Sequence, residues 1–285
     1  MRTSHRGLMA ARLHSCHMFL CLTFVLFFAG CGRSSHHAPQ RTTVTILCAS
    51  SALPAISKVA ESYESSIPAA DAAAAPRIIV ASGPSNMLAQ QILAGAPADL
   101  FLCANREWAC RIEQEDRVAE RVDLLFNRLV LVVPNGHDAG IQTLADLATA
   151  RDEFERISIA VCGQYVPLGI YSEQCLKQLN LLEAVHEKNN VVRTGNARAT
   201  LALVERGEVD AAIVYLSDAQ ASDAIEIREE ISPAMHEEIV YPLLLLGSRE
   251  SGTADGKAAR AFFQYLSSPA ALGTLADFGF RPAGF

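Results

Sequence analysis

The chain has 285 residues, of which 50% are hydrophobic and 19% are charged. These values fit a globular protein of one large or two medium domains and exclude a disordered chain. The formal net charge is −7, and because the first thirty residues carry three arginines and no acid, the remainder stands at −10. An acidic chain argues against nucleic acid or an anionic membrane face as partner, so any anionic ligand must be held by local donors.

The chain begins with a predicted export signal over residues 1–30. Three arginines precede an apolar run at 18–29, which is shorter than the roughly 20 residues that a helix needs to span a bilayer. Small residues then lead to Cys31, as in a bacterial lipoprotein signal, and we expect cleavage to leave this cysteine carrying lipid. An ordinary signal peptide or an uncleaved anchor is the alternative. Residues 31–42, with the neighbours His36 and His37, are predicted to be a polar tether rather than a metal site.

Cysteine usage is less informative. Of the eight cysteines, two lie in the signal and one is the lipid candidate. The other five form no Cys-x-x-Cys pair, and they are Cys48, Cys103, Cys110, Cys162 and Cys175. Cys162 could bridge to Cys175 in an exported protein, but we expect buried free thiols for most of the five.

Strands and helices are predicted to alternate along the mature chain. A strand at 45–47 runs into Ser50 and Ser51, which start a helix, and Ser85 starts another helix that ends at Gly95. Further strands are expected at 77–81, 100–103, 129–133, 157–161, 211–215 and 240–246. Further helices are expected at 107–114, 169–182, 197–206, 258–266 and 270–277. Such alternation predicts sheets with helices on both faces and ligands near helix N-termini.

Familiar catalytic patterns are missing from the sequence. It has no Gly-x-Ser-x-Gly, Ser-x-x-Lys, His-Glu-x-x-His, Gly-x-Gly-x-x-Gly or P-loop motif. His137, His186 and His236 lie in polar stretches, and we expect them on the solvated surface. Asp99 and Asp218 border strand ends, where capping or packing at a hinge is expected before acid catalysis.

Several blocks along residues 43–282 point together to one family. Residues 94–101 (AGAPADLF), preceded by Ser85 and residues 88–92 (LAQQI), resemble a segment of the periplasmic molybdate-binding proteins of ABC importers. The likeness continues in order through ASS (49–51), VPLGIY (166–171), ALVER (202–206), IVY (213–215), SDA (217–219), YP (241–242) and FGF (278–280). The resemblance implies an α/β fold of the type II solute-binding proteins, with two lobes that close on a ligand. Each lobe would be a mixed, mostly parallel sheet flanked by helices, with the ligand in the cleft between the lobes.

The family's ligand shell, carried onto this chain, falls on five residues. Ser51 and Ser85 would act from one lobe, and the backbone amides of Leu168 and Ala197 with the hydroxyl of Tyr215 from the other. Taken singly, the serines could be plain helix caps and Tyr215 a core residue. Together they predict an oxyanion site. Hydroxyl and amide donors suit a fully deprotonated dianion such as molybdate or tungstate and offer no acceptor to the proton of hydrogen phosphate. Sulfate would have to be excluded by its smaller size.

The resemblance also implies a domain organisation and a role. Lobe 1 is expected over 43–127 plus 239–285 and lobe 2 over 128–238, with the strands at 129–133 and 240–246 doubling as hinges. The implied role is extracytoplasmic capture of molybdate or tungstate for the permease subunits of an ABC importer. It involves no catalysis, no resident cofactor and no metal besides the oxyanion. We expect a monomer, held by lipid on Cys31 at the outer face of a bacterial membrane or in the periplasm.

Two alternatives remain open. One is a binding protein for another solute, such as sulfate, phosphate or a metal chelate. The other is an exported serine hydrolase that uses Ser51 or Ser85, which would need a nearby base that the sequence does not supply.

Overall fold

The computed structural model describes residues 42–68, 75–137, 140–149, 156–247 and 253–283. All of them belong to one unit of the chain, which runs from Pro39 to Phe285. The predicted export signal, the lipid candidate Cys31 and the histidine pair at 36 and 37 lie outside the described residues.

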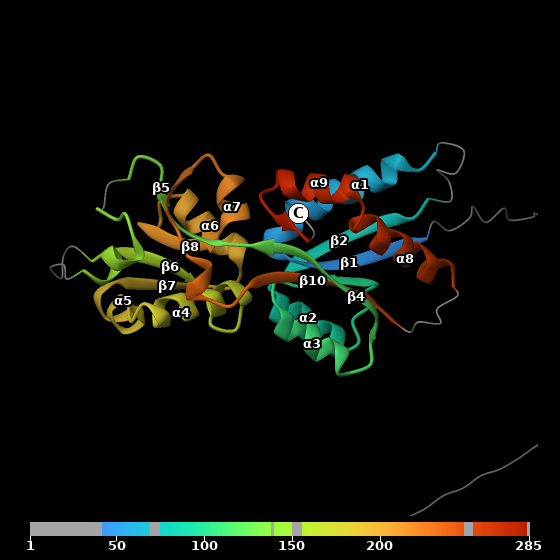
Figure 1. Cartoon of the computed structure of the whole chain (residues 1–285), viewed down its shortest axis with the longest axis horizontal. Helices are drawn as coiled ribbons and strands as arrows, with labels where there is room; N and C mark the ends of the chain where they lie inside the picture. The colour runs from blue at the N-terminus through green and yellow to red at the C-terminus, as the bar shows by residue number, and fades with distance from the viewer. Residues whose placement is uncertain (1–41, 69–74, 138–139, 150–155, 248–252, 284–285) are drawn as a thin grey trace, which may run out of the picture. The chain divides into compact units, whose positions relative to one another are not determined.

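The elements follow one another as strands and helices in alternation (Figure 1). The strands are β1 (Thr43–Ala49), β2 (Arg77–Gly83), β3 (Leu100–Leu102), β4 (Val118–Asn127), β5 (Leu129–Pro134), β6 (Ser158–Cys162), β7 (Asn190–Thr194), β8 (Ala211–Tyr215), β9 (Ile225–Glu230), β10 (Ile239–Leu246) and β11 (Arg281–Pro282). The α-helices are α1 (Leu53–Ser66), α2 (Ser85–Leu93), α3 (Arg106–Glu113), α4 (Pro167–Gln178), α5 (Leu182–Lys188), α6 (Ala197–Glu205), α7 (Leu216–Gln220), α8 (Ala254–Leu266) and α9 (Pro269–Asp277). Short 3-10 turns are η1 (Ser50–Ala52), η2 (Leu144–Ala148) and η4 (Pro233–Met235).

The first sheet has the strand order β11-β4-β10-β3-β1-β2. Successive side chains of a strand point to opposite sides of the sheet, and helices cover both sides, so both faces of this sheet are buried. Leu47 and Phe101 face α2 and α3, whereas Ile46 and Leu100 belong to the larger core that includes α1, α8 and α9. Figure 1 shows these two groups of helices on opposite faces of the sheet. The C-terminal helices therefore return to the sheet with which the described chain begins.

The second sheet has the order β7-β6-β8-β5-β9. Val130 and Val214 on one face pack with Leu201 and Val204 of α6, and the other face joins the core formed with α4 and α5. The chain passes from the first sheet to the second between β4 and β5, at Arg128, and returns between β9 and β10.

The fold class predicted from the sequence is confirmed, with one correction to the strand directions. In the first sheet β1 runs parallel to β2 and β3, but β10 and β4 pair antiparallel. In the second sheet β6 runs parallel to β7 and β8, but β5 pairs antiparallel with β8 and β9. Both sheets are therefore mixed rather than mostly parallel, because the strands that lead into and out of the crossings run against their neighbours.

Several elements differ from the sequence-based expectation. The strands β4, β7 and β9 were not predicted, since charged residues interrupt the apolar patterns of β4 and β9, and β7 has only two apolar residues. The helix expected over 169–182 ends at Gln178, and Asn180 adopts a left-handed conformation (φ 56°) before α5 begins. Leucines at 179, 181 and 182 continue the helical spacing through this turn, which concealed the break.

The other residues that the sequence singled out, an aspartate, the cysteines and a histidine, have contacts and burial that fit structural roles. Asp99 accepts a hydrogen bond from the Thr45 amide of β1 (2.7 Å), which is a structural contact between strands and not the cap of a helix. All five cysteines of the described chain are free, and four are buried, whereas Cys110 is exposed. His137 lies 2.9 Å from Asp210 and is half-buried rather than fully solvated. Within the described residues no cluster of three or more histidine, cysteine, aspartate or glutamate side chains could hold a metal ion.

Candidate functional site

The five residues predicted to bind a ligand line one pocket. Its wall is formed by Ala49, Ser50, Ser51, Gly83, Pro84, Ser85, Ala104, Val166, Pro167, Leu168, Ala197 and Tyr215. The elements around the first sheet contribute the residues up to 104, and α4, α6 and β8 contribute the others. The free volume of this pocket is about 10 Å³. That is about the room for one ordered water and far below the several hundred Å³ of an organic ligand's site.

Ser51 reaches the pocket from the 3-10 turn η1, directly after β1. It is 5% exposed, and its Oγ atom lies 2.8 Å from the Tyr241 Oη atom. Neither η1 nor α1 has a side-chain cap at its start. The interpretation of Ser51 as a plain helix cap is therefore wrong, because its hydroxyl is engaged with a tyrosine on β10.

Ser85 is the first residue of α2 and is 1% exposed. The N-cap position belongs to Pro84, and no side chain caps this helix. Ser85 Oγ instead accepts a hydrogen bond from the Ala104 amide at 3.0 Å. Because a hydroxyl that accepts one hydrogen bond keeps its own proton to donate, Ser85 is prepared to act as a donor toward the pocket.

Leu168 and Ala197 offer backbone amides at the starts of α4 and α6. Amides in the first turn of a helix have no partner within that helix. The N-cap of α6, Asn196, accepts from the Ala199 amide at 2.9 Å and thus leaves the Ala197 amide available. Two helix N-termini therefore point donors at the same small pocket, where their dipoles favour an anion.

The start of α4 is held in place by a glycine. A Cβ atom added at Gly169 would overlap the carbonyl oxygens of Gly163 and Cys162. Only glycine allows the first turn of α4 to approach the loop after β6 this closely. The position of the Leu168 amide therefore depends on Gly169.

The hydroxyl oxygen of Tyr215 gives the strongest indication that this pocket binds a ligand. The Tyr215 side chain is 1% exposed, and its Oη atom makes no hydrogen bond of normal geometry with any described residue. The ring lies edge-on to Tyr241, with 6.0 Å between centroids. Burial raises the pKa of Tyr241, and the Tyr215 hydroxyl is near enough to the Tyr241 hydroxyl to lower that pKa in part, as a hydrogen-bonding neighbour would, although the contact does not have the geometry of a normal hydrogen bond. Burial raises the pKa of Tyr215 well above its ordinary value, so the group is a neutral donor. An unpartnered buried hydroxyl costs about 1–3 kcal/mol, which indicates that a ligand completes it.

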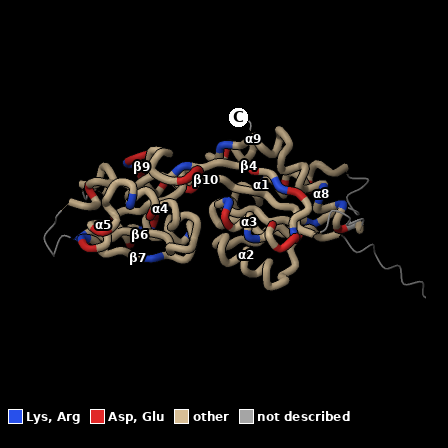
Figure 2. The backbone as a smooth tube through the Cα atoms, turned by 60° about the horizontal axis from the view of Figure 1, so that its bottom comes forward, with Lys and Arg blue, Asp and Glu red and all other residues tan. Residues whose placement is uncertain are grey.

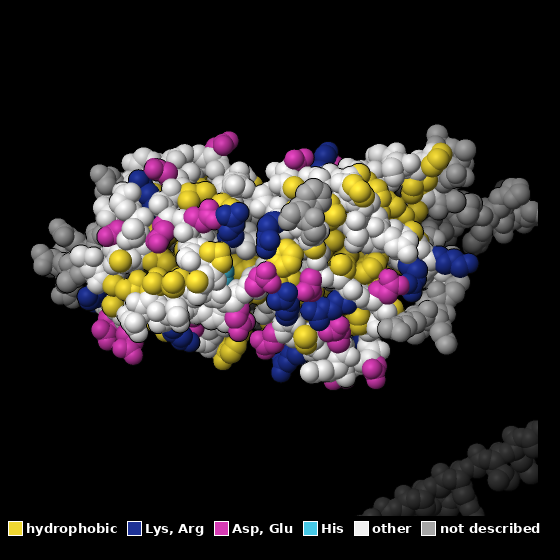
Figure 3. All heavy atoms as spheres, viewed as in Figure 1, with side chains coloured by type: hydrophobic (Ala, Val, Ile, Leu, Met, Phe, Trp, Pro, Cys, Tyr) yellow, Lys and Arg dark blue, Asp and Glu magenta, His cyan; other side chains and the backbone are white. Residues whose placement is uncertain are grey.

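The lining of the pocket includes no lysine, arginine, histidine, aspartate or glutamate. Figure 2 shows the basic and acidic positions spread over both halves of the described chain. Near the crossing strands they pair with each other: Arg106 contacts Asp123 and Glu238, and Arg281 contacts Glu238. Figure 3 shows such opposite charges interspersed on one face of the molecule. An anion in the pocket would therefore meet neutral donors only.

A hydrogen bond beside the pocket joins helix α4, which packs on the second sheet, to the segment that follows β3 of the first sheet. Tyr171 on α4 donates its hydroxyl to the carbonyl oxygen of Ala104, 3.3 Å away, just after β3. Burial raises the pKa of Tyr171, which keeps this donor protonated. Since the Ala104 amide supports Ser85, one peptide segment connects the serine of one half with a helix of the other.

Asp218 is a buried carboxyl group on α7. It is 3% exposed, and its Oδ2 atom has no hydrogen-bond partner among the described residues. Burial raises its pKa to about 7, and the charge of Arg198 lowers it in part. Asp218 is not among the residues that line the pocket, which agrees with a packing role near the crossing rather than acid catalysis.

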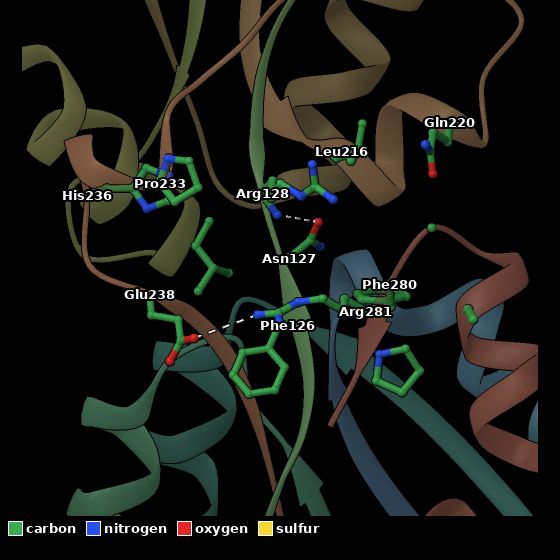
Figure 4. Close-up of a pocket in the computed structure, with 14 residues that line it drawn as sticks. Phe126, Asn127, Arg128, Leu216, Gln220, Pro233, His236, Glu238, Phe280 and Arg281 are labelled. Atoms are coloured by element: carbon green, nitrogen blue, oxygen red, sulfur yellow. Dashed lines mark hydrogen bonds and ion pairs between the residues drawn. The ribbon is translucent and has the colours of Figure 1, made fainter. Parts of the chain in front are cut away.

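A second, larger cavity of about 690 Å³ lies where the chain crosses between the sheets (Figure 4). It is lined by Phe126, Asn127, Arg128, Leu216, Gln220, Pro233, His236, Glu238, Ile239, Ala276, Gly279, Phe280, Arg281 and Pro282. Both of its arginines have acidic partners, since Arg128 pairs with Glu230 and Arg281 with Glu238. None of the five predicted ligand residues lines this cavity.

Sequence reasoning selected five residues that line the pocket but not the residues that contact them from behind. Tyr241 and Ala104, which engage the two serine hydroxyls, lie 190 and 19 residues away from them along the chain. The Tyr-Pro block at 241 and 242 was the one available signal for Tyr241, and it gave no partner for the hydroxyl.

The sequence matches the family described as bacterial extracellular solute-binding protein over residues 44–281. It is 32% identical to the candidate ABC transporter substrate-binding lipoprotein YvgL of Bacillus subtilis, covering 91% of this chain and 95% of that protein. It is 29% identical to the molybdate-binding protein ModA of Haemophilus influenzae, covering 91% and 96%. The structure of the Azotobacter vinelandii periplasmic molybdate-binding protein matches with a TM-score of 0.68 at 19% identity, covering 84% of this chain and 98% of that one. This likeness confirms the two-lobed fold. No described helix is long and apolar enough to cross a membrane.

Proposed function

Because the chain belongs to the bacterial extracellular solute-binding proteins, we propose that it captures molybdate or tungstate outside the cytoplasm and delivers it to the permease of an ABC importer. The molybdate-binding relative that spans almost the whole chain supports this choice of solute. The observation that carries the proposal is the buried, unpartnered hydroxyl of Tyr215, which shares one small pocket with two serines and two helix N-termini.

The donors are sufficient for tight binding. A hydrogen bond to a charged group contributes roughly 1.5–3 kcal/mol, so five donors offer about 8–15 kcal/mol in total. Sub-micromolar affinity needs roughly 8–10 kcal/mol. The upper part of this range leaves a margin for desolvating the anion and closing the lobes.

A shell of donors also favours particular anions. A fully deprotonated tetrahedral oxyanion can accept hydrogen bonds at every oxygen, whereas hydrogen phosphate would bury its own O–H without an acceptor. Sulfate is fully deprotonated but smaller, so it would leave several donors at stretched distances. We therefore rank molybdate and tungstate above sulfate, and sulfate above phosphate.

Catalysis is not part of the proposal. Ser51 Oγ contacts a tyrosine hydroxyl and Ser85 Oγ accepts from a backbone amide. A serine nucleophile would need a neighbouring general base. Incubation of the protein with generic esters, compared with variants that lack each serine, tests the alternative of an exported hydrolase.

We further propose lobes at 43–127 plus 239–285 and at 128–238, with ligand held between them. The changes of sheet at Arg128 and between β9 and β10 support these boundaries. We also propose that the mature protein is a monomer tethered by lipid on Cys31, which the description of the Bacillus subtilis relative as a lipoprotein supports.

Calorimetric titration of the mature chain with molybdate, tungstate, sulfate and phosphate tests the function. We expect sub-micromolar binding of the first two and weaker binding of sulfate and phosphate. Ser51→Ala should weaken molybdate binding about 10- to 100-fold, while Ser62→Ala, on the exposed face of α1, should leave it unchanged. Tighter binding of phosphate than of molybdate would overturn the proposal.

A further inference from the structure

A chain of hydrogen bonds leads from the crossing between the sheets to the ligand pocket. Asn127, the last residue of β4, places its Nδ2 atom 2.8 Å from Ser217 Oγ and 3.4 Å from Tyr241 Oη. Tyr241 Oη in turn lies 2.8 Å from Ser51 Oγ, which lines the pocket. Asn127 is thus connected to a candidate ligand-binding hydroxyl through one tyrosine.

The surroundings of Asn127 fix which way its amide faces. Its Oδ1 atom accepts from the Arg128 amide at 2.9 Å and from the Ser217 amide at 3.4 Å. Figure 4 shows the Asn127 oxygen directed at the Arg128 nitrogen. A flipped amide would set its N–H groups against two backbone N–H groups, so the NH₂ group must face Ser217 Oγ and Tyr241 Oη.

This orientation supplies one donor to the Tyr241 hydroxyl and so restricts how the hydroxyls beyond it can be arranged. An amide NH₂ can only donate, so Tyr241 Oη accepts from Asn127, and Ser51 Oγ at 2.8 Å is within reach as an acceptor for the tyrosine's own proton. When Tyr241 donates to Ser51 Oγ, the serine uses its lone pair there and keeps its own proton for the pocket. Without this constraint a serine hydroxyl can act as donor or acceptor. The direction of the relay therefore decides what Ser51 presents to a ligand.

We propose that Asn127 and Tyr241 are positioning residues that hold Ser51 as a hydrogen-bond donor and thereby make the site select fully deprotonated oxyanions over protonated ones. The inference rests on the proposed function and adds the source of its selectivity. The specificity of the pocket depends in this way on a residue that lies outside it, at the point where the chain passes from one sheet to the other.

The test is the isosteric variant Asn127→Asp. A carboxylate only accepts hydrogen bonds, so the Tyr241 hydroxyl would donate its hydrogen bond to the carboxylate at position 127 and not to Ser51. Ser51 would then donate to Tyr241 and turn a lone pair to the pocket. At pH 8, we expect molybdate binding to weaken about 10- to 100-fold relative to hydrogen phosphate binding. Sulfate, which carries no proton, should weaken in step with molybdate, and this comparison separates donor direction from the repulsion of the added charge.

The double variant Asn127→Asp with Tyr241→Phe gives a second measurement. Without the Tyr241 hydroxyl no relay exists, so Asn127→Asp should no longer change the ratio of molybdate to hydrogen phosphate affinity. If Asn127→Asp leaves this ratio unchanged, or changes it equally in the Tyr241→Phe background, the inference is overturned while the proposed function stands. If the unmodified chain binds no molybdate, the proposed function itself fails.

Discussion

The unpartnered hydroxyl of Tyr215 leads to a prediction in which stability and affinity respond differently. In the variant Tyr215→Phe only one oxygen is lost, because the ring keeps its place among buried side chains of the core. If the Tyr215 hydroxyl only stabilised the core, its removal would lower the stability of the protein and leave ligand affinity unchanged. If the hydroxyl binds the ligand, its removal should lower ligand affinity without lowering stability.

The magnitudes follow from the surroundings of the hydroxyl. Tyr215 Oη is buried and lacks a partner in the described chain, so its removal relieves a desolvation penalty of up to about 1–3 kcal/mol. The free protein should therefore be as stable as the parent or more so. The hydrogen bond to a dianion contributes about 1.5–3 kcal/mol, so the dissociation constant for molybdate should rise about 10- to 150-fold.

Two measurements on the same preparation check this prediction. Urea unfolding without ligand gives the change in stability, and calorimetric titration with molybdate gives the change in affinity. Tyr63→Phe is the matched control, because Tyr63 packs with Phe262 and Tyr265, away from the pocket lining, and should leave affinity unaltered. A Tyr215→Phe protein that is less stable by more than 1 kcal/mol but binds molybdate normally would refute the reasoning.

Three further variants address other parts of the account. Ser85→Ala removes a donor and leaves the Ala104 amide unpaired, so we expect about 10- to 100-fold weaker molybdate binding and a loss of about 1–3 kcal/mol in urea unfolding; unchanged affinity would contradict the role of Ser85. Gly169→Ala forces α4 away from the Gly163 carbonyl, and it should cost about 1–3 kcal/mol and weaken binding, whereas Gly273→Ala on α9, which has open space, should do neither. Asp218 has a pKa of about 7 against an ordinary 3.8, so the folded state binds more protons than the unfolded state between these values, and stability falls as the pH rises through this range. Asp218→Asn should match the parent near pH 4 and exceed it at pH 8 by up to about 4 kcal/mol, and a parent protein whose stability rises from pH 4 to 7 more steeply than that of the variant would contradict this.

Local patterns predicted most of the elements that form the site. The strand β8 has the bounds expected from its five apolar residues, and α2 and α6 begin at Ser85 and Ala197 as expected. Gly95 and Gly207 end these helices with φ values of 93° and 65°, which glycine tolerates best. These features depend on neighbours in the sequence, which is why the sequence alone revealed them.

The supporting contacts could not be predicted in this way. The strand β4 carries charged residues that pair with α3, as Arg121 does with Glu113, so its pattern did not indicate a strand. The partners of Ser51 and Asn127 are set by how the two sheets meet and not by spacing. Whether a serine caps its helix or contacts a distant tyrosine is decided by tertiary packing, and the simpler interpretation as a cap was wrong at both Ser51 and Ser85.

A crystal structure of the mature chain with tungstate tests the central claim most directly, because anomalous scattering locates the tungsten atom without reference to the protein. The account predicts a single strong peak within hydrogen-bonding reach of Ser51, Ser85 and Tyr215 and of the amides of Leu168 and Ala197. A peak elsewhere on the chain, or bound tungstate that Tyr215 does not contact, would contradict it.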